Sequence, residues 1–143
     1  MSADANLAAV QQIYAAFGQG DVAAIQEVCA EDVRWEDWAD NFGQRAGLDH
    51  FKARSGRDGV AEFFAVAGAM EISDFQVLST MASDEQVAVE IEIEAALPGG
   101  GAYRDQEIHL WTFDGDGKVS RLRHYADTAK HIAAAGGEDT RAG

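Results

Sequence analysis

Apolar residues recur every three or four positions in the first part of the chain, which is the spacing of one face of an α-helix. Leu7, Val10, Ile13, Tyr14 and Phe17 follow this pattern. They predict an amphipathic helix that ends in the glycine-containing stretch 18–20.

Three more elements are indicated before residue 70. Asp21 is a good N-cap for a second helix, and Asp58 is a good N-cap for a third. Between these helices, Val33 and Trp35 alternate with polar residues, as in a short strand. The apolar face of the second helix consists of Val22, Ile25, Val28 and Cys29, and that of the third helix consists of Val60, Phe63, Phe64 and Ala67.

From residue 72 onward the chain has the composition of strands, separated by short turn signals rich in Gly, Asp and Ser. Short separators between consecutive strands predict an antiparallel meander. Helices first and strands later predict an α+β fold with the helices on one face of an antiparallel sheet. The predicted strands are 72–81, 86–97, 103–113 and 119–125.

The chain of 143 residues, 47% of them hydrophobic, predicts one domain over 1–143 with a core at about 5–131. Residues 38–56 lack a clear periodicity and predict a long loop, with a helical turn around 48–53. This loop is either a binding loop or a surface insertion. Residues 133–143 predict a frayed tail.

Charge excludes several classes of partner. The chain carries 25 acidic and 11 basic residues, a net charge of −14, which disfavours nucleic acids and anionic membrane surfaces. Cys29 is the only cysteine, so no intrachain disulfide forms, and its place on an apolar helix face predicts a core residue. With neither a secretory signal nor a membrane-spanning stretch in the sequence, we expect a cytoplasmic protein.

Both faces of the predicted strand 103–113 are partly apolar. Trp111 and Phe113 point one way, whereas Ile108 and Leu110 point the other. Because the helices cover only one face of the sheet, we expect the other face to pack on a second copy of the chain in a homodimer.

Two ionisable residues in apolar segments are the candidates for proton transfer, because burial and neighbouring charges shift pKa values. Asp37 follows the first short strand and is either a general base or a strand-end residue that caps the next loop. His109 shares a strand face with Glu107 and Trp111. It either donates to an oxyanion and shuttles protons or is a core histidine bonded to Glu107.

Other residues are expected to shape a pocket around this pair. His124 lies on the last strand, and two histidines with a carboxylate can ligate a metal. No metal-binding spacing motif is present, however, and we expect neither metal nor cofactor. The predicted substrate-binding residues are Tyr14, Trp35, Trp111, Leu122 and His124.

Short motifs spread over residues 7–127 resemble the nuclear transport factor 2-like superfamily, in its SnoaL-like and ketosteroid-isomerase-like branch. This resemblance implies a cone-shaped α+β barrel, in which a curved sheet wraps around a helix and encloses a pocket, and which is usually dimeric. The motifs are Tyr14 to Phe17, Gly20-Asp21-Val22, Glu31 to Trp35, Gly56 to Val60 followed by Phe63-Phe64, and Trp111 to Val119.

The resemblance to ketosteroid isomerase places the catalytic base of that enzyme on Asp37 and one oxyanion donor on His109. The tyrosine donor falls on Ile13, with Tyr14 one place away. The expected function is therefore cofactor-independent acid–base chemistry on a small apolar carbonyl or cyclic metabolite, as in isomerases and polyketide cyclases. A non-catalytic module for an apolar ligand or a protein partner stays open as an alternative, and so does an epoxide hydrolase or dehydratase.

Overall fold

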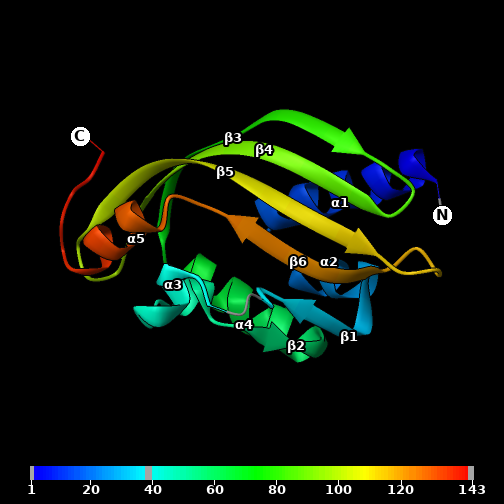
Figure 1. Ribbon diagram of the computed structural model, residues 1–143, viewed down its shortest axis with the longest axis horizontal. Helices are drawn as coiled ribbons and strands as arrows, with labels where there is room; N and C mark the ends of the chain where they lie inside the picture. The colour runs from blue at the N-terminus through cyan, green and yellow to red at the C-terminus, as the bar shows by residue number, and fades with distance from the viewer. Residues whose placement is uncertain (1, 38–39, 142–143) are drawn as a thin grey trace.

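A curved sheet of six strands forms the body of the protein (Figure 1). The computed structural model describes residues 2–37 and 40–141. The sheet order is β2-β1-β6-β5-β4-β3, and β1 runs parallel to β6 while every other pair is antiparallel. The strands are β1 (Cys29–Trp35), β2 (Arg54–Ser55), β3 (Glu71–Ala82), β4 (Gln86–Ala96), β5 (Ala102–Phe113) and β6 (Val119–Tyr125).

The helices begin and end at local signals in the sequence. The Ser2 side chain accepts a hydrogen bond from the Ala5 amide at the start of the first helix, and Asp21 does the same for Ala24 in the second. The helices are α1 (Ala3–Gly18), α2 (Val22–Val28), α3 (Phe42–Arg45), η1 (Asp49–Phe51), α4 (Gly56–Gly68) and α5 (Thr128–Ala135), of which η1 is a 3₁₀ turn.

The α+β class, the first two helices and the four-strand meander are confirmed. The predicted cap of the third helix is wrong. Helix α4 begins at Gly56, after Ser55, so that Asp58 lies in its first turn. A carboxylate there still stabilises the helix, because it faces the positive end of the helix dipole. The sheet is mixed, since β1 inserts between β2 and the meander and lies parallel to β6.

Two segments contain more regular structure than the sequence indicated. The predicted loop 38–56 contains α3, η1 and β2 over its described part, and residues 38–39 lie outside the described residues. The predicted tail from 133 instead includes the end of α5 and a bridge between Ala102 and Asp139. The reason is burial, because His131 and Ala134 of α5 are almost fully enclosed against β5. Residues 142–143 lie outside the described residues.

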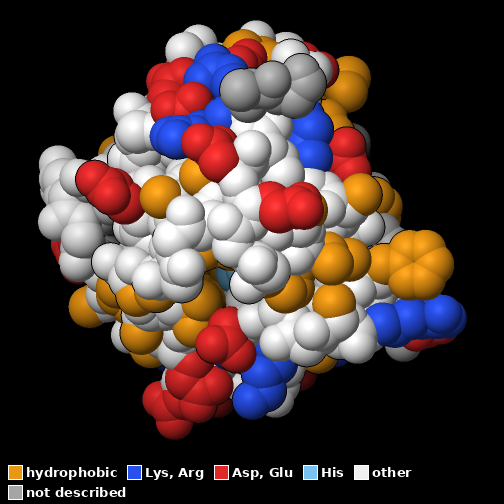
Figure 2. Space-filling view, turned by 90° about the vertical axis from the view of Figure 1, so that its left-hand side faces the viewer, with side chains coloured by type: hydrophobic (Ala, Val, Ile, Leu, Met, Phe, Trp, Pro, Cys, Tyr) orange, Lys and Arg blue, Asp and Glu red, His pale blue; other side chains and the backbone are white. Residues whose placement is uncertain are grey.

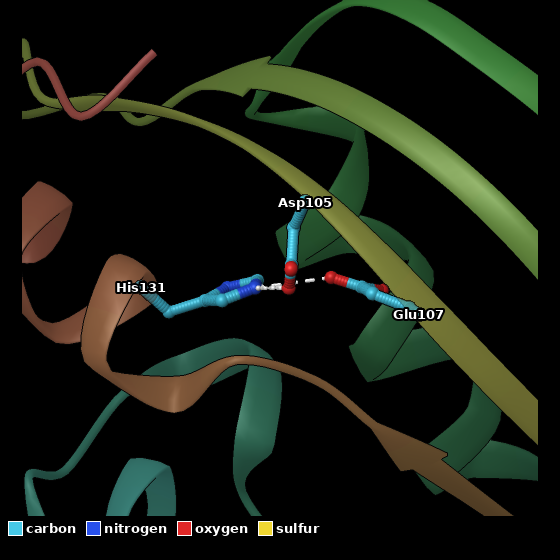
Figure 3. A group of neighbouring side chains, drawn as sticks. All are labelled: Asp105, Glu107 and His131. Carbon is cyan, nitrogen blue, oxygen red and sulfur yellow. Dashed lines mark hydrogen bonds and ion pairs between the residues drawn. The ribbon is translucent and has the colours of Figure 1, made fainter. Parts of the chain in front are cut away.

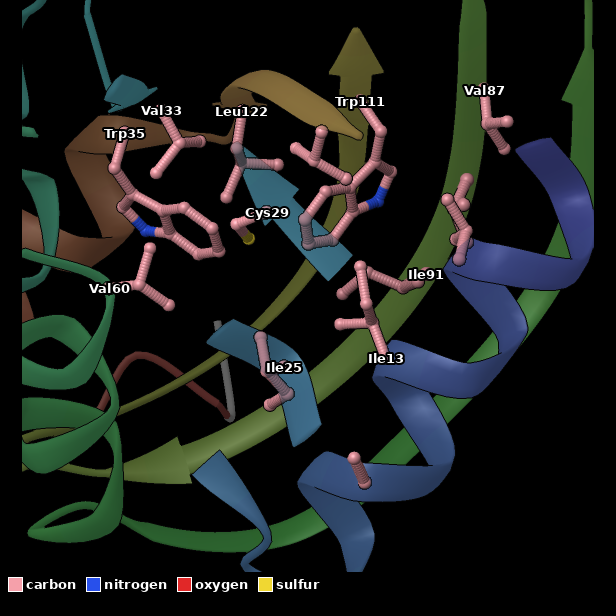
Figure 4. Close-up of a cluster of buried hydrophobic side chains, with 14 of the residues drawn as sticks. Ile13, Ile25, Cys29, Val33, Trp35, Val60, Val87, Ile91, Trp111 and Leu122 are labelled. Atoms are coloured by element: carbon pink, nitrogen blue, oxygen red, sulfur yellow. The ribbon is translucent and has the colours of Figure 1, made fainter. Parts of the chain in front are cut away.

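The hydrophobic core fills the inner, concave side of the sheet, between the strands and helices α1, α2 and α4 (Figure 4). Trp35 and Trp111 lie at its centre, 5.7 Å apart between ring centroids. Cys29 is fully buried among these side chains, as predicted, but it begins β1 and is not part of the second helix. Burial raises the pKa of its thiol to about 11. Among the described helices, none is both long and apolar enough to cross a membrane.

The docking of α5 gives a first prediction, because the backbone of Gly101 lies directly against it. A Cβ atom on Gly101 would lie 1.7 Å from the Ala134 carbonyl oxygen. We expect Gly101→Ala to lower the free energy of unfolding by on the order of 2–4 kcal/mol, measured by urea denaturation. Gly99→Ala is the control, since a Cβ there meets nothing within 4 Å. Equal stability of the two variants would contradict this packing.

Candidate active site

An aromatic cavity lies between the concave side of the sheet and helices α1 and α4. Its volume, measured as the space open to the centre of a water molecule, is about 90 Å³. One water needs about 10–15 Å³ on that measure, so the cavity has room for several waters or a small organic molecule. The aromatic residues of its wall are Tyr14, Phe17, Trp35, Phe63, Phe64, Phe75, Tyr103 and Trp111.

Figure 2 shows the end of the molecule at which α5 lies in Figure 1. A narrow depression is visible near the centre of this face, with hydrophobic side chains around it and histidine atoms at its bottom. The interior is therefore not completely sealed at this end.

The structure brings most of the predicted site residues together on the cavity wall. His109 lies there, and so do all five predicted substrate-binding residues. They come from α1, β1, β5 and β6, which are far apart in the sequence. They are Tyr14, Trp35, Trp111, Leu122 and His124.

Asp37 is the exception, and the structure does not bring it together with His109. Among the described residues that line the cavity, Asp37 does not appear. Its Oδ1 accepts a hydrogen bond from Arg123 Nε at 2.9 Å, and its Oδ2 lies 3.0 Å from Arg34 Nη1. Strict alternation along β1 would put Asp37 on the same face as Trp35. The left-handed backbone of Glu36, with φ +57°, breaks that alternation and buries Glu36 instead.

Glu107 is the carboxylate that His109 meets. Its Oε1 lies 3.7 Å from His109 Nε2 and 3.6 Å from His124 Nε2, while its Oε2 lies 3.0 Å from His131 Nε2. Burial alone would raise the pKa of Glu107, but these three imidazoles together hold it well below its usual range. Glu107 is therefore a buried, ionised carboxylate that is also part of the cavity wall.

His124 lies between two carboxylates. Glu36 Oε2 accepts from its Nδ1 at 2.8 Å, and Glu36 Oε1 accepts from its backbone N–H at 2.9 Å. Burial alone would lower the pKa of His124, but the negative charges of Glu36, Glu107 and Asp105 raise it to about 9. Its ring is therefore an imidazolium at neutral pH, with Nε2–H on the side of Glu107.

A second buried imidazole lies on α5. His131 points from this helix toward β5, and its Nε2 lies 2.9 Å from Asp105 Oδ2 and 3.0 Å from Glu107 Oε2 (Figure 3). Burial opposes its charge, but hydrogen bonds to both carboxylates raise the pKa of His131. Its Nδ1 lies 2.8 Å from His50 Nε2. Burial and the neighbouring imidazoles lower the pKa of His50 to about 3, so His50 is neutral.

The same three groups raise the question of a metal. Ligand atoms of Asp105, Glu107 and His131 all lie within 4.8 Å of one another, which is a spacing that can hold a divalent cation. A proton on His131 Nε2, shared by the two carboxylates, already accounts for their approach. We therefore treat the group as a hydrogen-bonded network and assign no metal to it.

A chain of hydrogen bonds fixes the tautomer of His109. Trp111 Nε1 donates to the Tyr14 hydroxyl oxygen at 3.2 Å, and this hydroxyl lies 2.6 Å from His109 Nδ1. Because Glu107 Oε1 lies 3.7 Å from His109 Nε2, a neutral His109 carries its proton on Nε2, and the Tyr14 hydroxyl donates its hydrogen to Nδ1. Burial raises the pKa of Tyr14, so the hydroxyl stays protonated.

Sequence reasoning missed several members of this network, for different reasons. Glu107 appeared only as a neighbour of His109, although its place two residues away on one strand face was a usable signal. His50 fell in the predicted loop 38–56, and His131 fell just before the predicted tail 133–143. Glu36 was assigned to the polar side of its strand. Asp105 was not considered at all.

The cavity, the curved sheet and the helices within it define a class of protein, the cone-shaped NTF2-like fold. Within that class, the family model of the SnoaL-like domain matches residues 10–122. The chain belongs to the SnoaL-like family.

Solved structures agree on the fold. An NTF2-like protein from Burkholderia xenovorans has a TM-score of 0.75 and 23% identity, over 94% of this chain and 98% of that one. TerC, co-crystallised with polyporic acid, has a TM-score of 0.72 and 23% identity, over 91% and 97%. Rv0760c from Mycobacterium tuberculosis, in complex with estradiol-17beta-hemisuccinate, has a TM-score of 0.68 and 19% identity, over 87% and 94%. No curated protein matches the chain.

The imidazolium of His124 gives a prediction about pH. Its pKa rises from 6.5 to about 9 on folding, so its stabilisation is fully present below pH 6.5 and is lost as pH rises through about 9. We expect the free energy of unfolding, measured in urea, to fall by on the order of 3 kcal/mol across this window. In His124→Gln the fall should be much smaller. A wild-type protein with constant stability from pH 6.5 to pH 9 would contradict the ion pairing.

Proposed function

We propose that this protein is a cofactor-independent acid–base enzyme that acts on a small apolar carbonyl or cyclic metabolite, in the manner of an isomerase or a cyclase. One observation carries the proposal. A buried ionised carboxylate, Glu107, lies on the wall of an aromatic cavity, with the Nε2 atoms of two imidazoles at 3.6 and 3.7 Å from one of its oxygens.

These distances are too long for direct hydrogen bonds, and all three residues line the cavity, so both N–H groups are able to donate to a ligand in the cavity. A substrate oxygen placed there would accept from His109 Nε2–H and from His124 Nε2–H. Both donors are fixed before the substrate arrives, His109 by Tyr14 and His124 by Glu36. Fixed donors of this kind stabilise the negative charge that develops on a carbonyl oxygen during enolisation.

Glu107 takes the role of base in this scheme. It removes a proton from the carbon next to the substrate carbonyl, and the electron pair of the C–H bond moves to form the enolate. The two imidazole N–H groups stabilise the enolate oxygen. Where a C=C bond of the substrate is conjugated with the enolate, Glu107 returns the proton to the far carbon of that bond, the C=C bond shifts by one position, and the carbonyl forms again. The net reaction is an isomerisation, with no change in the overall composition of the substrate.

The wall of the cavity supports an apolar ring as the rest of the ligand. Most of the wall is apolar, and it also includes Glu107, His50, His109 and His124. The ligands in the solved structures of TerC and Rv0760c, polyporic acid and an estradiol ester, are also ring compounds with oxygen substituents. The fold therefore accommodates this class of ligand elsewhere.

The proposal predicts the loss of proton exchange in Glu107→Gln. We expect the wild-type protein to catalyse deuterium exchange next to the carbonyl of at least one member of a panel of cyclic ketones, followed by NMR. Removing the base should slow this exchange by about 100-fold or more. Glu90→Gln is the matched control, because Glu90 is exposed on the opposite face of the sheet. Equal exchange in both variants would remove Glu107 from the mechanism.

A non-catalytic binding module is the second candidate, and one observation favours it. Glu36, Asp105 and Glu107 already have imidazole partners inside the protein, as in a structural network. This candidate predicts that cyclic ketones bind, with shifts in the NMR signals of cavity residues, and that no exchange occurs. The same panel of ketones therefore separates the two functions.

We also propose a homodimer through the outer face of the sheet. Met81, Ala88 and Leu110 are neighbours across β3, β4 and β5 on this face, and Ile108 pairs with Tyr125 beside them. Met81 is 68% exposed and Tyr125 is 40% exposed. A contiguous apolar surface of this kind favours contact with a second copy.

We expect light scattering to give twice the chain mass of 15.3 kDa for the wild type, and the single chain mass for Ala88→Glu, since Ala88 lies between Met81 and Leu110. A charge buried without a partner at the interface would separate the two copies. Gln12→Glu on the exposed side of α1 should stay dimeric. A monomeric wild type would refute this interface.

A further inference from the structure

Glu36 combines features that are rarely found together. It is the one described non-glycine residue with a left-handed backbone, at φ +57°, and its side chain is fully buried. This conformation costs free energy for a residue with a long side chain. It persists only where contacts with the rest of the structure outweigh this cost.

Hydrogen bonds of both its backbone and its side chain hold Glu36 in this conformation. The Glu36 amide donates to the Leu122 carbonyl oxygen at 2.8 Å, and the Glu36 carbonyl oxygen accepts from Gln44 Nε2 at 2.9 Å. Its two carboxylate oxygens accept from the His124 amide and from His124 Nδ1. The residue is thus held by β6 on one side and by α3 on the other.

We propose that Glu36 is a positioning residue for His124. The left-handed backbone of Glu36 at the end of β1 directs its carboxylate toward Nδ1 of the ring. The hydrogen bond to Nδ1 fixes the ring so that Nε2–H faces Glu107 and the cavity. Because Nδ1–H donates to the Glu36 carboxylate, the proton on Nε2 belongs to the imidazolium form of the ring, which the adjacent carboxylate stabilises. This role rests on the proposed function only in that His124 is a donor to the substrate oxygen.

Several groups face His124 and must be counted in any test. The carboxylates of Glu36, Glu107 and Asp105 favour its charge, whereas the imidazoles of His109, His131 and His50 lie on the other sides. The ring of Phe51 stacks on it at 4.6 Å and excludes water. Of the carboxylates that raise the pKa of His124, Glu36 has the largest effect, and it accepts a hydrogen bond from the ring.

The test is the pKa of His124, followed by NMR of the ring in protein with labelled histidine. In the wild type we expect about 9. In Glu36→Gln, which keeps the shape and loses the charge, we expect a fall of at least about one unit. Asp37→Asn is the matched control, because it removes the adjacent carboxylate, which lies outside the cavity and pairs with Arg34 and Arg123. That variant should titrate as the wild type does.

Glu36→Gly is the second variant, since glycine adopts the left-handed conformation without strain and so keeps the turn while removing the carboxylate. Its His124 should also titrate at least about one unit lower, and added formate, a small carboxylate, should raise the value again. A His124 that titrates in Glu36→Gln or Glu36→Gly as in the wild type would overturn the proposal. Because none of these measurements needs turnover, their failure is distinguishable from a failure of ketone exchange.

Discussion

The buried carboxylate of Glu107 is the constraint on which the rest of the site depends. A charge placed in an apolar core is very costly unless it is paired and hydrogen-bonded. Here three imidazoles meet that requirement, and they come from β5, β6 and α5. The network therefore connects α5 to the middle of the sheet. Through His131, this helix contributes to the charge balance of the cavity wall.

The charges of this network explain the division of roles among the four histidines. His124 and His131 each lie beside two carboxylates, and their pKa values are raised. His50 lies beside His131, away from direct contact with a carboxylate, and stays neutral. His109 receives the Tyr14 hydroxyl on Nδ1, so its other nitrogen faces the cavity carboxylate as a donor. A single type of side chain thus provides the buried cation of His124, the neutral ring of His50 and the fixed donor of His109.

The sequence predicted the fold class and most of the secondary structure much better than the residues of the candidate site. Periodicity and turn residues were sufficient for α1, α2 and the meander, because each of these elements is determined by local pattern and burial of one face. His109 and the aromatic wall were found because residues on one strand face share one environment. Asp37 was misplaced because one left-handed residue, Glu36, inverts the alternation at the end of β1. Local sequence contains no sign of that inversion, since the bonds that enforce it come from Leu122, Gln44 and His124.

The titration of Glu107 tests the central claim most directly. In protein with labelled glutamate carboxyl carbons, the Glu107 signal should keep the chemical shift of a carboxylate as the pH falls through its usual value of 4.5, for as long as the protein stays folded. Exposed glutamates such as Glu90 serve as internal references in the same spectrum. A Glu107 carboxyl that takes up its proton at or above pH 4.5 in the folded protein would contradict the claim that three imidazoles hold it ionised.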